Sequence, residues 1–300
     1  MGLGRQPQEE ANFDTQKRAI RYILIEGRSS EPQFLGENRF SRSALSGESM
    51  RMQGNTIFIT GGTSGIGKGL AEAFYKLGNQ VIISGRREDR LREICAANPG
   101  MRYFLLDVRD PVAIRTIARK VVAEFRSLNC VFNNAGVQRR LEFAPGMPLD
   151  DEALCDEIDT NVLGVIRIAA EFIPHLAQQS NAALVNVSSG LAFVPMARFP
   201  VYCATKAAVH SFTLSLRRQL RSSGVKVIEL IPPYLGTELG GLRKTVAPGS
   251  PQPMPLQDFI AETMKELEGG GDEIAIGDAK NLVAATNSEK LKTVFAGMNR

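Results

Sequence analysis

The chain has 300 residues, of which 43% are hydrophobic and 23% charged, and its formal net charge is +4. Such a chain can bury one large core, and its interspersed basic and acidic residues form no stripe that would indicate a nucleic-acid partner. The sequence contains no run of 18 apolar residues, so it predicts no membrane span.

Residues 1–50 differ in composition from the rest of the chain. They mix Arg and Glu with Gly, Ser, Pro and Gln, and their one apolar patch, 22–25, is too short for a signal sequence. We expect this stretch to be a disordered extension of a folded domain that covers 51–300. The alternative is that the natural start lies at Met50 or Met52, just before the first strand.

The first strand is expected at 56–59, and it leads into a glycine-rich turn at 60–67, TGGTSGIG. A periodic apolar segment at 70–77 then predicts a helix. Strand, glycine turn and helix in this order are typical of dinucleotide binding, because the turn brings the backbone close to a phosphate at the helix start. The glycine spacing differs from G-x-G-x-x-G, and a tight turn without a ligand is the alternative.

Strands and helices alternate along the remaining chain. Further strands are expected at 80–84, 103–106, 129–132, 183–187, 225–230 and 273–276. Further helices are expected at 88–97, 111–125, 151–178, 202–221 and around 259–267. The strands are apolar almost throughout, as parallel strands covered on both faces are. The sequence therefore predicts one α/β domain, a single doubly wound parallel sheet (Rossmann fold) with helices on both faces.

Two side chains at the start of the 202–221 helix indicate acid–base chemistry. Tyr202 and Lys206 are four residues apart and share one helical face. Tyrosine ordinarily has a pKa of about 10, and a neighbouring ammonium favours the phenolate, as a general acid/base at neutral pH requires. Taken alone, the pair favours a half-buried tyrosine beside a solvated lysine.

In combination these motifs resemble the short-chain dehydrogenase/reductase family over about 56–237. The features that carry the resemblance are the glycine turn, the sequence NNAG at 133–136, an upstream serine and the Tyr-x-x-x-Lys pair. The segments 54–56, 189–196, 232–237 and 295–299 resemble the DltE-like branch, whose usual start aligns near Met50. The resemblance implies an oxidoreductase that interconverts a carbonyl and an alcohol by hydride transfer with a nicotinamide cofactor.

The resemblance also implies four catalytic residues. Ser189, thirteen residues before the tyrosine, would hydrogen-bond the substrate oxygen, and Tyr202 would exchange a proton with that oxygen. Lys206 would hold the nicotinamide ribose and lower the pKa of the tyrosine. Asn161 would hold a water that relays protons to the lysine.

Cofactor choice depends on the end of the second strand. NAD-preferring members have an acidic residue there, whereas this chain has Gly85 followed by Arg86 and Arg87. This favours NADP(H) over NAD(H), because a guanidinium binds a 2′-phosphate, although both arginines could simply be solvated. Asp107 would contact adenine, and its alternative role is to cap the helix that begins near Pro111. The expected cofactor contacts are Gly61, Thr63, Ser64, Gly65, Ile66, Gly67, Arg86, Arg87, Asp107, Val108, Asn133, Ala135, Gly136, Tyr202, Lys206 and Thr237.

One departure from the family pattern follows the sixth strand. Pro233 replaces the usual glycine before Thr237, and proline fixes φ and lacks an N–H, so this turn can follow a different path. The substrate, a small carbonyl or alcohol, is expected between a lid at about 234–255 and the segment after Ser189. Both segments are rich in apolar side chains.

Other functions were weighed against this one. A catalytically silent NADP(H)-binding sensor would have the same fold. A serine hydrolase built on Ser189 would need a histidine with an acid partner, and neither His175 nor His210 has an evident one in the sequence. Neither histidine has metal-ligand spacing, so no metal is expected. The scattered cysteines indicate a cytoplasmic protein, and the helices at 151–178 and 202–221 lead us to expect a homodimer or homotetramer.

Overall fold

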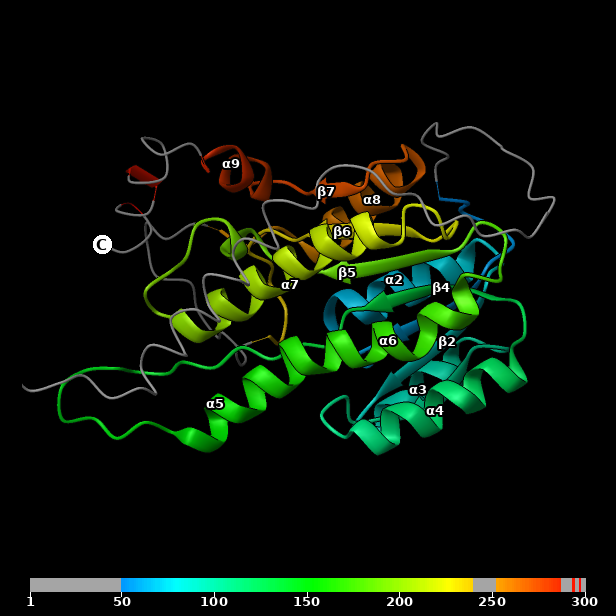
Figure 1. The fold of residues 1–300 in the computed structure, drawn as a ribbon, viewed down its shortest axis with the longest axis horizontal. Coiled ribbons are helices and arrows are strands. Elements are labelled where there is room, and N and C mark those ends of the chain that lie inside the picture. Colours follow the sequence, from blue (N-terminus) through cyan, green and yellow to red (C-terminus); the bar gives the residue numbers. More distant parts are fainter. Residues whose placement is uncertain (1–49, 240–251, 287–292, 295–296, 298–300) are drawn as a thin grey trace, which may run out of the picture. The chain divides into compact units, whose positions relative to one another are not determined.

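The computed structural model describes residues 50–239, 252–286, 293–294 and 297. In this part of the chain, seven parallel strands form one sheet in the order β3-β2-β1-β4-β5-β6-β7 (Figure 1). Their bounds are β1 (Thr56–Thr60), β2 (Gln80–Gly85), β3 (Arg102–Leu105), β4 (Leu128–Asn133), β5 (Ala183–Val187), β6 (Lys226–Ile231) and β7 (Glu273–Ala275). The chain winds outward from β1 in both directions, which confirms the predicted doubly wound sheet.

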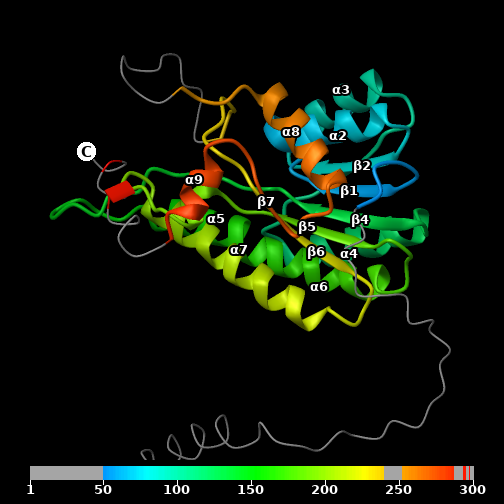
Figure 2. The same ribbon diagram turned by 90° about the horizontal axis from the view of Figure 1, so that it is seen from above.

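Helices cover both faces of this sheet (Figure 2). The described helices are α2 (Gly65–Lys76), α3 (Glu88–Ala97), α4 (Pro111–Glu124), α5 (Asp151–Ile158), α6 (Gly164–Leu176), α7 (Pro200–Gln219), α8 (Leu256–Glu268) and α9 (Ala279–Ala284). Apolar side chains of α2, α3 and α8 pack in one core, and those of α4, α6 and α7 pack in a second core.

Alternate residues of β1 supply these two cores. Ile57 and Ile59 belong to the core with α2, α3 and α8, whereas Phe58 belongs to the other. The ring of Phe58 lies 5.1 Å from that of Phe172 on α6, centroid to centroid. All four side chains are fully buried. Because both faces are covered, the three central positions of the strand are all apolar, which is why its sequence indicates a parallel sheet.

Element bounds agree with the expected ones within a few residues, with one structural addition. The helix expected at 151–178 is α5 and α6 joined by a π-helical turn, η1 (Asp159–Leu163). A π turn widens the helix locally and commonly occurs at functional sites. A short 3₁₀ turn, η2 (Gly190–Ala192), and helix α9 were not predicted.

Two predictions lie partly or wholly outside the described residues. These are the N-terminal extension at 1–50, of which only Met50 is described, and the central part of the lid expected at about 234–255. At the edges of the lid, Leu235 forms a parallel β-bridge with Met254. Among the described residues, no helix is both long and apolar enough to cross a membrane.

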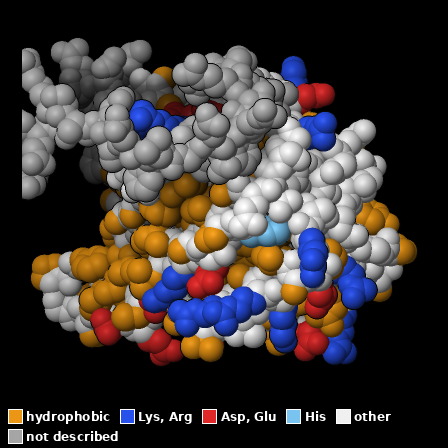
Figure 3. All heavy atoms as spheres, turned by 45° about the vertical axis from the view of Figure 1, so that its right-hand side comes forward, with side chains coloured by type: hydrophobic (Ala, Val, Ile, Leu, Met, Phe, Trp, Pro, Cys, Tyr) orange, Lys and Arg blue, Asp and Glu red, His pale blue; other side chains and the backbone are white. Residues whose placement is uncertain are grey.

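Charged side chains of both signs are mixed on the face shown in Figure 3. Ion pairs such as Arg139 with Asp156, at 2.6 Å, join some of the charged residues of the domain. The mixture on this face matches the interspersed charges of the sequence.

Asp110 is the N-terminal cap of α4. Its carboxylate accepts hydrogen bonds from the N–H groups of Val112 and Ala113, at 2.8 and 3.0 Å, and Pro111 occupies the first helical position. The alternative in which Asp107 caps this helix is therefore wrong. We expect Asp110→Ala to lower the free energy of unfolding by about 1 kcal/mol, because two N–H groups lose their acceptor. Chemical denaturation measures this change.

The control is Lys120→Ala, an exposed position on the same helix. It should change the free energy of unfolding by less than about 0.5 kcal/mol. Equal changes in the two variants would contradict the assignment of the cap.

Candidate active site

Several of the predicted site residues follow the carboxyl ends of the strands. The glycine turn follows β1, the arginines follow β2, Asp107 follows β3 and Ser189 follows β5. The carboxyl ends of parallel strands meet at one edge of a sheet, and doubly wound sheets bind ligands at that edge.

The glycine turn lies against the segment that leaves β4. Gly61 has a φ of +68°, and a Cβ at this position would lie 2.8 Å from the Cα of Ala135. A Cβ at Gly67 would collide with the side chain of Asn134. The Asn134 amide donates to the carbonyls of Thr60 and Gly61, at 2.9 and 3.3 Å. Glycine is needed at these positions because the two backbones approach so closely.

The side chain of Asn133 is hydrogen-bonded to neighbouring elements of the fold. Its amide donates to the Val165 carbonyl at 3.2 Å and to Oδ1 of Asn186 at 2.9 Å, and the residue is buried. These bonds tie β4 to β5 and α6. Both bonds use the amide nitrogen, so this nitrogen serves the fold and not a cofactor.

Arg87 lies over the glycine turn. Its Nη2 donates to Oγ1 of Thr63 at 2.9 Å and to Oγ of Ser64 at 2.7 Å, and its Nη1 pairs with Glu238 at 3.0 Å. These contacts argue against a merely solvated Arg87. A Cβ at Gly85 would lie 2.8 Å from Cγ2 of Thr63, so an acidic side chain there would displace the threonine.

Asp107 belongs to a network of ion pairs. The Arg109 guanidinium donates to both of its carboxylate oxygens, at 2.6 to 3.0 Å, and holds the pKa of Asp107 below its usual range. Arg109 also pairs with Asp156 of α5 at 2.8 Å, and Arg86 lies 4.0 Å from the same carboxylate. The network connects the end of β3 to α5.

Val108 and Thr237 lie beside glycines. Val108 is buried against α6, where a Cβ at Gly164 would lie 2.9 Å from its carbonyl oxygen. A Cβ at Gly65 would lie 3.5 Å from Cγ2 of Thr237, so this threonine reaches the glycine turn despite the departure at Pro233.

Tyr202, Lys206 and Ser189 are brought together at the start of α7. Tyr202 is 5% and Lys206 4% exposed, and the lysine Nζ lies 5.8 Å from the centre of the tyrosine ring. Lys206 donates to the carbonyl of Val187 at 2.9 Å, and the side chains of Ser189 and Tyr202 are hydrogen-bonded to each other.

Burial dominates the ionisation of this pair. It raises the pKa of the Tyr202 phenol above its usual value, and the hydrogen bond with Ser189 only partly opposes this. Burial also lowers the pKa of Lys206 to about 8, against the charges of Glu157 and Glu229. The expected lowering of the tyrosine pKa by Lys206 is therefore not found, because desolvation outweighs the other interactions.

Asn161 lies in the π turn and faces Lys206 across Gly136. Its Oδ1 accepts from the Val137 N–H at 2.9 Å, and its Nδ2 donates to the Val137 carbonyl at 2.8 Å and to Oγ1 of Thr205 at 3.1 Å. A Cβ at Gly136 would lie 3.3 Å from Oδ1 of Asn161 and 3.6 Å from Nζ of Lys206. The structure thus brings all four predicted catalytic residues to one place.

His210 has an acid partner, contrary to the expectation from the sequence. Its Nδ1 lies 2.8 Å from Oε2 of the fully buried Glu229, and Glu273 brings a third ligand-type atom, all within 4.8 Å of one another. The partners come from different elements, so sequence spacing gave no signal. The side chain of Ser189 is hydrogen-bonded to that of Tyr202. This argues against a serine hydrolase built on Ser189.

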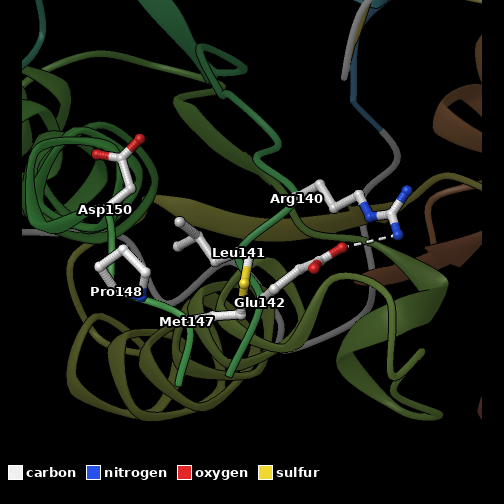
Figure 4. A pocket seen from close by; sticks show the side chains of 6 residues that line it. All are labelled: Arg140, Leu141, Glu142, Met147, Pro148 and Asp150. Carbon is white, nitrogen blue, oxygen red and sulfur yellow. Dashed lines mark ion pairs between the residues drawn. The ribbon is translucent and has the colours of Figure 1, made fainter. Parts of the chain in front are cut away.

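A hollow of about 370 Å³ lies in the segment between β4 and α5 (Figure 4). Its lining consists of Arg140, Leu141, Glu142, Met147, Pro148 and Asp150. Arg140 and Glu142 form an ion pair at 2.7 Å. None of the predicted site residues lines this hollow.

Comparison with known proteins decides the family. The sequence profile of the family described as short chain dehydrogenase matches residues 55–245. The chain belongs to the short-chain dehydrogenase family. It is 39% identical to the uncharacterized oxidoreductase DltE of Bacillus subtilis strain 168, over 83% of this chain and 98% of that protein, which confirms the DltE-like resemblance. It is 32% identical to the NADP-dependent 3-hydroxy acid dehydrogenase YdfG of Escherichia coli K12, over 62% of this chain and 75% of that protein.

Solved structures of short-chain dehydrogenases share this fold. One from Burkholderia cenocepacia J2315 in complex with NADP has a TM-score of 0.71 at 24% identity and covers 83% of this chain and 99% of its own. A serine dehydrogenase complexed with NADP⁺ has a TM-score of 0.65 at 26% identity, covering 74% and 94%. The prediction of an oxidoreductase enzyme is thus confirmed, whereas the roles of its individual residues stay predictions.

The crowding at Gly61 leads to a stability prediction. Gly61→Ala should lower the free energy of unfolding by clearly more than the about 1–2 kcal/mol that a positive φ costs, because the new Cβ also meets the Ala135 backbone. Thermal and chemical denaturation measure the difference. Gly78→Ala is the control, since Gly78 has a φ of +79° but no atom within 4 Å of its Cβ position. Equal costs would contradict the close approach.

Proposed function

We propose that this oxidoreductase is NADP(H)-dependent and interconverts a carbonyl and an alcohol, with Tyr202 as general acid/base. The observation that carries the proposal is the buried cluster of Tyr202, Ser189 and Lys206 beside a glycine turn that leaves no room for side chains. The turn fits a dinucleotide phosphate, because bare backbone is the surface that such a phosphate approaches.

The side chains divide the reaction among themselves. Ser189 donates a hydrogen bond to the substrate oxygen, where negative charge develops during reduction. Tyr202 gives its proton to that oxygen; its raised pKa keeps it protonated at neutral pH, the state that reduction needs. The reverse reaction needs the phenolate, which the burial of Tyr202 disfavours. Lys206 would hold the nicotinamide ribose. When bound, the nicotinamide supplies or accepts the hydride. Asn161 fixes the backbone segment beside Lys206.

NADP(H) is favoured over NAD(H) by the surroundings of β2. Arg87 presents a guanidinium beside Thr63 and Ser64, and Gly85 provides no carboxylate that would repel a 2′-phosphate. The relatives point the same way, since one is named an NADP-dependent dehydrogenase and another was solved with NADP⁺.

The substrate side of the site is apolar. Phe199 and Cys203 pack with Tyr202, and Leu191 and Met196 lie against this cluster. We therefore infer a small carbonyl compound with an apolar portion as the substrate class. The homodimer or homotetramer stays a prediction; exposed apolar side chains on α5, α6 and α7, namely Ile158, Ile166 and Leu214, are consistent with it.

Replacement of Tyr202 tests the mechanism. Tyr202→Phe should reduce turnover of a carbonyl panel with NADPH by about 10²–10⁴-fold, because the proton donor is lost, while NADPH affinity changes little. Assays of NADPH oxidation measure turnover, and nucleotide fluorescence measures the affinity for NADPH. Tyr75→Phe is the matched control, since its hydroxyl only bonds the Pro99 carbonyl on the surface. Unchanged turnover in Tyr202→Phe would overturn the mechanism, and wild-type NADPH binding without turnover would favour the sensor.

Replacement of Arg87 tests the nucleotide preference. Arg87→Ala should weaken NADPH binding by about 10–100-fold, the equivalent of one or two charge-assisted hydrogen bonds, and leave NADH binding nearly unchanged. Fluorescence titration with both nucleotides measures this selectivity. Arg90→Ala serves as the control, because Arg90 lies in α3, the helix that Arg87 precedes, and pairs with Glu93. An equal loss for both nucleotides would show that Arg87 supports the turn and does not read the 2′-phosphate.

A further inference from the structure

The one buried residue of helix α5 is an acid. Glu157 is 0% exposed, and its Oε1 accepts a hydrogen bond from the Arg139 N–H at 2.9 Å. Its Oε2 is also buried and has no hydrogen-bond partner among the described residues. A buried carboxylate with an unpaired oxygen is costly, so this position calls for an explanation beyond packing.

Glu157 and Asn161 hold the same stretch of backbone. Asn161 binds both the N–H and the carbonyl of Val137, and Glu157 binds the N–H of Arg139. The two side chains are four residues apart in the helix formed by α5 and η1, and the two residues they bind are two apart along the chain. Together they fix the segment that begins with Gly136, which lies between Asn161 and Lys206.

The carboxylate of Glu157 also acts on α7, against which α5 packs. Burial lowers the pKa of Lys206, and the negative charge of Glu157 opposes this. Burial raises the pKa of Tyr202, and the charge of Glu157 adds to this. Burial raises the pKa of Glu157 itself, and the Arg139 N–H and the positive charges of Arg139 and Lys206 oppose this. The other charged groups facing this set are Asp156 on α5, which acts on Glu157, and Glu229 on β6, which acts on Lys206.

We propose that Glu157 is a positioning residue of the active site: it fixes the Gly136–Arg139 segment against Asn161 and Lys206, and it is the buried counter-charge of the Lys206 ammonium. An effect of Glu157 on catalysis rests on the proposed function. The effect of its charge on Lys206 is measurable without turnover.

The test is an NMR titration of protein labelled with ¹³C at the lysine ε position. The Cε signal of Lys206 is assigned by its absence in Lys206→Arg, and its pKa is followed with pH. Glu157→Gln keeps the shape and removes the charge, so the pKa of Lys206 should fall by about 0.5–1 unit. Glu157→Asp keeps the charge and should restore most of the wild-type value. Glu152→Gln, an exposed acid on the same helix, should leave it unchanged.

An unchanged pKa of Lys206 in folded Glu157→Gln would overturn the proposal. If that variant does not fold, the wild-type titration decides, because the Lys206 signal should show a second inflection where Glu157 gains its proton. Absence of that inflection would also overturn the proposal.

Kinetics separates this proposal from the proposed function. Where the wild type turns over a carbonyl, the kcat–pH profile of Glu157→Gln should move to lower pH, since both Lys206 and Tyr202 lose their proton more easily. A profile that keeps its position while kcat falls would show a purely structural role and contradict the proposal. A shifted Lys206 pKa in a protein without turnover would support the role of Glu157 and contradict the proposed function.

Discussion

The site depends on the hydrogen bonds that lock the end of β1 to the end of β4. The Thr60 hydroxyl donates to the Phe132 carbonyl at 3.2 Å and accepts from the N–H groups of Asn134 and Ala135, both at 3.0 Å. Asn134 returns a bond to the Thr60 carbonyl. β1 and β4 are the neighbouring strands from which the chain winds outward on either side, so this lock fixes the crevice where doubly wound sheets bind ligands. Because these hydrogen bonds bring the two segments so close together, the turn after β1 has glycines where side chains would not fit.

Burial is the second constraint, because it dominates the ionisation of the groups at the start of α7 and of Glu157. Tyr202, Lys206 and Glu157 are all buried. Low dielectric disfavours a charge on each of these three groups and strengthens their mutual interactions. The pKa of about 8 for Lys206 is thus a balance between desolvation and two neighbouring carboxylates. A lysine poised in this way can change its protonation near neutral pH, which a solvated lysine with an ordinary pKa does not do.

The sequence predicted the sheet well because local patterns determine it. Continuous apolar runs, glycine turns and Pro111 mark the strands, their exits and a helix start without knowledge of the contacts. Contacts between residues that are distant in the sequence have no such local pattern. His210 pairs with Glu229 on another element, and Thr60 is hydrogen-bonded to Asn134, which follows the neighbouring strand. Glu157 stands in an acidic stretch that resembles a solvated helix face. The predicted direction of the Tyr202 pKa shift was wrong, because the sequence spacing shows the neighbouring Lys206 but not the burial of the phenol.

In the proposed enzyme, nucleotide preference and turn geometry are one property. Cγ2 of Thr63 fills the space beside Gly85, and the Thr63 hydroxyl and Ser64 hold the guanidinium of Arg87. A carboxylate at position 85 would therefore push against Thr63, and displacement of Thr63 would remove one of the two hydrogen bonds that Arg87 donates to the turn. It would also place a negative charge near that guanidinium. In the proposed enzyme, a change of preference toward NAD(H) would therefore involve positions 63, 85 and 87 together, because Thr63 lies against Gly85 and also holds the guanidinium of Arg87.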